Sequence, residues 1–174
     1  MALNWVQMKN HSIMLVAAYR RLIEERPRED GQPGVEVPKP AALVMAALAI
    51  EIRFKSLICR QRNITDVVQL KALKVPDGGH NLYELYQLLD DETKFMLSAG
   101  FDKYYGGNIE TMIVTNGFID DDQLEGLLTP KSFDEELMRA SRTFMDWRYS
   151  YELDHVGSHL SFVKYLIDRL SVIF

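Results

Sequence analysis

An arginine and a histidine, Arg148 and His155, stand seven positions apart in the segment WRYSYELDH. A guanidinium binds phosphate oxygens in bidentate geometry. An imidazole titrates near neutral pH, so it can give or take a proton during a reaction. The pair could therefore act on a phosphate ester. The alternative is structural: Glu152 lies four residues after Arg148, so the two can pair along a helix, shielded by Trp147 and Tyr151.

A second group of polar residues lies in and after the most apolar segment of the chain. Glu51 and Lys55 are four residues apart on one helix face, and isoleucines flank Glu51 on both sides. A carboxylate buried there needs a partner, which Lys55, His80 or Arg148 can supply. His80 itself is interpreted as a capping or core histidine. The residues predicted to form a structural polar cluster are Glu51, Lys55, His80, Tyr151 and Glu152.

Other chemistries find little support in the sequence. His155 and His159 have the spacing of a helical metal pair, but Gly157 lies between them and no HExxH pattern is present. The three aspartates at 120–122 fit a solvated helix start. There is no glycine-rich phosphate loop and no nucleophile elbow. We therefore expect neither a metal nor a cofactor.

Composition and charge place the chain among globular proteins. It has 174 residues, 47% of them apolar and 26% charged, with a net charge of −5. This acidity does not favour DNA, whereas a local basic patch for RNA remains compatible with it. The single cysteine, Cys59, is predicted to be a buried, inert thiol. The N-terminal residues lack the basic region followed by an apolar core that is typical of a signal peptide. The apolar run at 41–50 is too short to span a membrane. We expect a cytoplasmic protein without a membrane partner.

The hydrophobic periodicity predicts an all-α fold, a helical bundle of four to five main helices in one domain over 1–174. Pro27 and the proline-rich stretch that follows predict a loop before the longest apolar helix. The segment 108–117 fits either a strand or a short helix, and the helix is favoured because little else reads as a strand partner. The predicted helices cover residues 12–26, 40–62, 82–89, 90–100, 108–117, 120–128, 132–152 and 158–174. Ser132 and Glu135 form a capping-box pattern at the start of the helix over 132–152, and Ser158 is predicted to cap the last helix.

Three segments, in order, resemble the HEPN superfamily (higher eukaryotes and prokaryotes nucleotide-binding). They are AALAIEIRFKSLI, GHNLYELYQLL and SFDEELMRASRTFMDWRYSYE. The last is the most specific, because it contains the pattern F-x-x-W-R-Y-x-Y-E. The resemblance covers about residues 40–90 and 130–174, and the stretch 91–130, which we interpret as an insertion of short helices and loops, has no counterpart.

The resemblance implies a helical bundle that often forms a homodimer. Many members are metal-independent endoribonucleases in toxin–antitoxin, phage-defence or RNA-processing systems. Others are inactive and serve as modules that bind RNA, a nucleotide or a protein partner, such as a nucleotidyltransferase. Catalytic members carry an arginine followed after four to six residues by a histidine, as Arg148 and His155 do here. Tyr149 stands where those members have a polar residue. The catalytic and the non-catalytic function both remain open.

Overall fold

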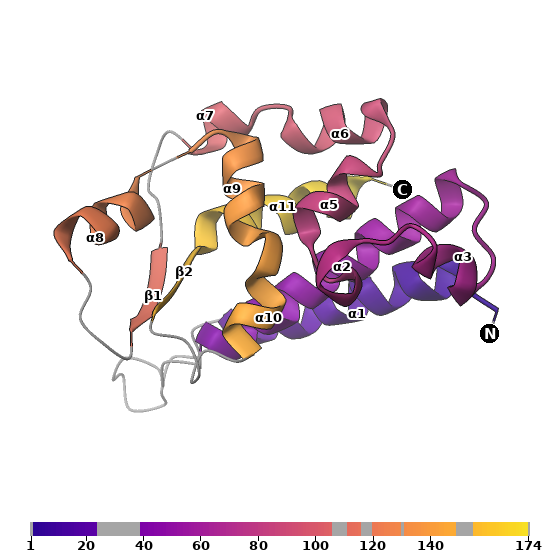
Figure 1. Ribbon diagram of the computed structural model, residues 1–174, viewed down its shortest axis with the longest axis horizontal. Helices are drawn as coiled ribbons and strands as arrows, with labels where there is room; N and C mark the ends of the chain where they lie inside the picture. Colours follow the sequence, from indigo (N-terminus) through magenta and orange to yellow (C-terminus); the bar gives the residue numbers. More distant parts are fainter. Residues whose placement is uncertain are drawn as a thin grey trace.

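A computed structural model provides the fold of the protein (Figure 1), and it is mostly helical, as the sequence predicts. Among the residues it describes, no helix combines the length and the apolar composition that crossing a membrane requires. The described residues are 2–23, 39–105, 111–115, 120–129, 131–148 and 155–173.

Three helices of 13 residues or more form the frame of the described structure, and most of the shorter helices lie beside them, whereas the helix over 121–128 lies at the edge of the fold (Figure 1). The frame helices are α1 (Trp5–Ile23), α2 (Lys39–Gln61) and α11 (Leu160–Val172). The shorter elements are α3 (Val67–Lys71), α4 (Pro76–Gly79), α5 (Leu82–Gln87), α6 (Asp91–Ser98), α7 (Phe101–Tyr105), α8 (Asp121–Leu128), α9 (Phe133–Arg139), the 3-10 turn η1 (Ala140–Arg142), α10 (Thr143–Arg148) and the strands β1 (Thr111–Thr115) and β2 (His155–His159).

Helix α2 lies at the centre of the fold. It packs along α1 and also contacts α5, α10 and α11. Its first half is nearly all apolar, and Leu43, Ala46 and Ile50 are buried there, as the sequence predicts. The second half continues the core through Phe54 and Ile58. Every other element that carries a functional candidate is therefore positioned against α2 or against a helix that touches it.

A group of aromatic rings joins the middle of the chain to its C-terminal helix. The ring of Phe101 lies 5.5 Å from that of Phe133 and 5.6 Å from that of Phe162, both in edge-to-face geometry. The hydroxyl of Tyr165 donates to the carbonyl oxygens of Leu97 and Ala99, at 2.8 and 3.0 Å. Helices α6 and α7 thus belong to the core, although their sequence has no counterpart in the HEPN resemblance.

Tyr86 contributes a buried phenol to this core and should make the protein sensitive to alkali. Burial, followed by the charge of Asp134 and by Tyr83, raises its pKa from 10.0 to about 12. The Tyr86 phenol therefore ionises at lower pH in the unfolded chain than in the folded one. Its contribution to stability is fully present below about pH 10 and is lost as pH rises toward 12. We expect the wild type to lose about 2 kcal/mol more than Tyr86→Phe over this interval. Urea unfolding of both proteins at a series of pH values measures it, and parallel profiles would contradict it.

Several helix ends follow the predicted capping chemistry. Ser132 and Glu135 form the predicted capping box, with both reciprocal hydrogen bonds present. Asp90 caps α6 by accepting from the backbone N–H of Thr93 at 2.8 Å. Helix α1 begins earlier than predicted because the Asn4 side chain accepts from two backbone N–H groups of the first turn, at 3.0 and 3.2 Å.

The structure corrects three predicted elements. Residues 111–115, within the segment favoured as a helix, form strand β1, which pairs antiparallel with β2 in a register that sets Thr111 opposite His159. The β-branched residues of β1 favour a strand, whereas HVGSH in β2 has a single such residue, so the sequence did not identify the partner. Ser158 lies in β2 and does not cap the last helix, which begins at Leu160. The predicted helix over 132–152 is divided into α9, η1 and α10.

Candidate functional site

A buried carboxylate with two cationic or ionisable partners forms the centre of the candidate site. The Glu51 side chain on α2 is 3% exposed. Its Oε1 accepts a hydrogen bond from the Lys55 ammonium at 2.6 Å, and its Oε2 lies 2.8 Å from Nδ1 of His80. Each carboxylate oxygen therefore has its own partner, as a buried carboxylate requires. The structure confirms Lys55 and His80 as partners of Glu51.

The turn before α5 positions His80. Asp77, Gly78 and Gly79 all have positive φ, at 56°, 67° and 93°, a conformation that favours glycine. Gly79 lies against the ion pair, because a Cβ at this position would be in ordinary van der Waals contact with the Lys55 ammonium at 3.5 Å. The positive φ, and not a lack of space, is therefore what favours glycine there. Asn81 then caps α5 by accepting from the Glu84 backbone N–H at 3.1 Å. The PDGGHN sequence thus fixes where the imidazole lies.

The 3-10 turn η1 contacts the His80 turn through Arg142, and helix α10, which follows η1, packs against α2. Nε of Arg142 lies 3.8 Å from Asp77 and 3.7 Å from Asp146. Burial raises the pKa of Asp146, and Arg142 counteracts this rise. Because the Arg142 side chain is 57% exposed, these ion pairs contribute little stability. They do show that the His80 turn, η1 and α10 meet next to α2.

The two predicted catalytic residues lie on different elements. Arg148 is the last residue of α10, and His155 is the first residue of β2. Helix α10 and strand β2 are nevertheless in contact. The side chains of Arg148 and His155, and the predicted cluster members Tyr151 and Glu152, lie outside the part of the chain that the structure describes.

The polar cluster is suited to orienting a group that transfers protons. A carboxylate bound to one ring nitrogen fixes the orientation of an imidazole, and the His80 side chain is 33% exposed. The cluster thus reaches the surface through His80 while Glu51 stays buried. Within the described ranges, no three His, Cys, Asp or Glu side chains gather in a way that could hold a metal ion. Cys59 is buried, which raises the pKa of its thiol, in agreement with the predicted inert role.

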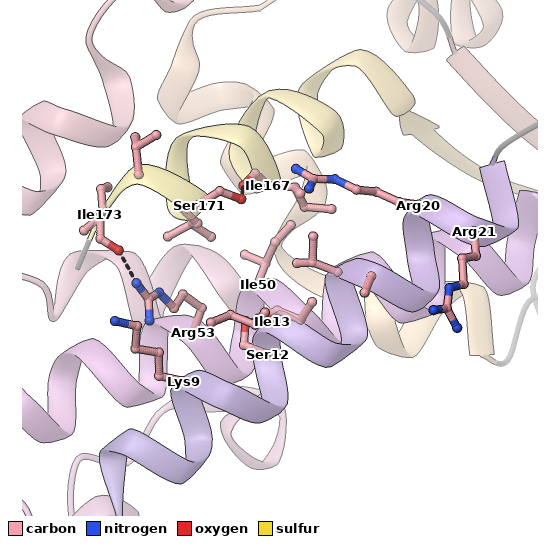
Figure 2. Close-up of a pocket in the computed structure, with 15 residues that line it drawn as sticks. Lys9, Ser12, Ile13, Arg20, Arg21, Ile50, Arg53, Ile167, Ser171 and Ile173 are labelled. Carbon is pink, nitrogen blue, oxygen red and sulfur yellow. Dashed lines mark hydrogen bonds between the residues drawn. The ribbon is translucent and has the colours of Figure 1, made fainter.

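A second candidate site was missed by the sequence analysis. A groove of about 780 Å³ runs between α1, α2 and α11, and Arg53 of α2 contributes a buried guanidinium to it (Figure 2). Arg53 follows Ile50 by three residues on the inward face of α2, where an apolar residue is expected. That misfit is the signal that could have revealed it. The groove is lined by Lys9, Ser12, Ile13, Val16, Ala17, Arg20, Arg21, Ala49, Ile50, Arg53, Ile167, Leu170, Ser171, Val172 and Ile173.

Comparison with protein-family models, with curated proteins and with solved structures gives no match to this chain.

Proposed function

We propose that the chain is a HEPN-like helical protein with an RNA-related role in defence or stress. The observation that supports this is the meeting of the three segments that carry the resemblance. Glu51 and Lys55 come from the first segment and His80 from the second. The third contributes α10, next to α2, and Arg142, which faces the turn that precedes His80. Segments from three distant parts of the sequence thus lie next to one another beside α2.

The proposed reaction is metal-independent cleavage of RNA by Arg148 and His155. The 2′-hydroxyl attacks the adjacent phosphorus, the bond to the 5′-oxygen breaks, and the products are a 2′,3′-cyclic phosphate and a 5′-hydroxyl. His155 removes or supplies the proton, and Arg148 stabilises the charge that builds up on the phosphate oxygens. The contact between α10 and β2 supports this pairing, because it brings the elements of the two residues together. A homodimer would place two such pairs near each other.

Incubation of the purified protein with total RNA in the presence of EDTA tests this reaction. We expect cleavage by the wild type that leaves 2′,3′-cyclic phosphate ends. Removing a general acid or base typically costs a factor of about 100 or more, so we expect His155→Ala to cleave at least about 100-fold more slowly. His11→Ala is the matched control, because His11 is an exposed histidine on α1 and lines neither site.

The possible outcomes test the role of His155 and the ribonuclease activity separately. Cleavage by His155→Ala at the wild-type rate would show that His155 is not the proton-transfer group. An absence of RNA cleavage by the wild type would refute the proposed ribonuclease activity. An equal loss of activity in His11→Ala would indicate a general effect on folding in place of catalysis.

The second candidate is a non-catalytic module that binds RNA, a nucleotide or a protein such as a nucleotidyltransferase. Both oxygens of Glu51 are paired, and this favours a cluster that stabilises the fold. Fluorescence anisotropy with a labelled RNA oligonucleotide tests this function. Binding without cleavage would support it, and cleavage that depends on His155 would refute it.

A further inference from the structure

The groove between α1, α2 and α11 contains a buried cation without an anionic partner in the described structure. Arg53 is 5% exposed. Its guanidinium donates to the carbonyl oxygen of Ile173 (Figure 2), and no carboxylate of the described residues pairs with it. Burial, followed by the charge of Arg60, lowers the pKa of Arg53. A buried guanidinium is costly unless an anion compensates it, so this end of the groove is suited to an anionic group.

The remaining charged residues of the groove are all cationic. Figure 2 shows Lys9 beside Arg53 at one end and Arg20 and Arg21 toward the other. None of the lining residues is acidic, although the chain as a whole carries a net charge of −5. Arg20 pairs with Asp168 at 3.4 Å, outside the lining. The end formed by Lys9 and Arg53 therefore keeps the larger uncompensated charge.

The serines of the groove are already used as donors. The Ser12 hydroxyl donates to the carbonyl oxygen of Ala49, and the Ser171 hydroxyl donates to that of Ile167, both at 2.8 Å. Lys9 and Arg53 are thus the groups that remain to bind an anion at their end of the groove.

The middle of the groove is apolar. Ile13, Ile50 and Ile167 lie between the two cationic ends (Figure 2), and Ile13 is 55% exposed. Lys9 and Arg20 are separated by eleven residues of α1, or about 16 Å along the helix. The volume of about 780 Å³ is within the usual range for small-molecule sites, which combine apolar walls with a few polar groups. A nucleic-acid strand fits poorly here, because its phosphates would need cations along the whole groove.

We propose that this groove binds a small amphiphilic anion, with a carboxylate or phosphate head between Arg53 and Lys9 and an apolar body over Ile13 and Ile50. The head supplies the anionic partner that Arg53 lacks among the described residues. The apolar body covers the exposed side chain of Ile13. This site is separate from the polar cluster of Glu51 and does not depend on the proposed RNA-related function.

Isothermal titration calorimetry with decanoate, below its micelle concentration, tests the proposal. We expect one site per chain, with decanol binding at least tenfold more weakly because it lacks the charge, and inorganic phosphate at least tenfold more weakly because it lacks the apolar body. Arg53→Met and Lys9→Met should each weaken decanoate binding at least tenfold. Lys164→Ala, which removes an exposed lysine of α11 outside the groove, should bind as the wild type does. A parallel titration with decyl phosphate shows which of the two heads the site prefers.

Each other result overturns part or all of the proposal. No decanoate or decyl phosphate binding by the wild type would refute the site. Equal binding of decanol would refute the role of charge, and equal binding of inorganic phosphate would refute the role of the apolar middle. Unchanged binding by a folded Arg53→Met, checked by circular dichroism, would place the ligand elsewhere. If Arg53→Met does not fold, the Lys9→Met variant provides the test. Unchanged decanoate binding by Lys9→Met would refute the placement of the anionic head between Lys9 and Arg53.

Discussion

Replacing Lys55 by methionine is expected to lower the free energy of unfolding by about 3 kcal/mol. The methionine keeps the apolar stem of the lysine, but it leaves the 3%-exposed carboxylate of Glu51 with His80 as its remaining described partner. Removing one member of a buried ion pair is strongly destabilising, because the other charge stays buried without compensation. Urea unfolding of the wild type and Lys55→Met measures the difference.

The double variant Glu51→Met with Lys55→Met should recover most of this loss. Apolar residues often replace a buried ion pair without a net cost, so the two changes should be coupled by about 1 to 3 kcal/mol. Arg20→Met is the matched control, because its ion pair with Asp168 is about half exposed and should be worth less than about 1 kcal/mol. If Lys55→Met unfolds at the wild-type urea concentration, the buried ion pair does not contribute to stability as inferred.

The parts of the fold that local chemistry determines could be predicted from the sequence. The apolar run that forms α2, the capping box at Ser132 and the turn glycines before His80 each act over a few residues, so their effect can be read directly. The strand pair could not be predicted in this way. HVGSH becomes a strand through pairing with residues 111–115, which lie 40 to 48 positions earlier in the chain, and its own composition gives almost no strand signal.

The polar cluster could be predicted in part for the same reason. Lys55 is four residues from Glu51, so helix geometry alone brings the two together. His80 was one of three candidate partners, and only the packing of its turn on α2 selects it. Arg53 was missed, because a charged residue within an apolar helix is ordinarily exposed. Its burial depends on α1 and α11, which come from opposite ends of the chain.

Replacing Phe54 by alanine is expected to be the most destabilising of these single changes, at about 3 to 5 kcal/mol. Phe54 is fully buried in α2, and its ring lies 6.5 Å from that of Tyr86 on α5. Alanine would remove the buried ring and leave a cavity that rigid helices on several sides cannot fill. Urea unfolding with far-ultraviolet circular dichroism detection gives the change in stability.

Phe95→Ala is the matched control, because Phe95 also lies in a helix but is 71% exposed, so its loss should change stability by less than about 0.5 kcal/mol. Equal effects of the two substitutions would mean that α2 is not the centre of the core. Successive residues of a helix point about 100° apart, so Arg53, Phe54 and Lys55 face the groove, the core and the polar cluster in turn. The packing of Phe54 thus fixes the rotation of α2 that both candidate sites require.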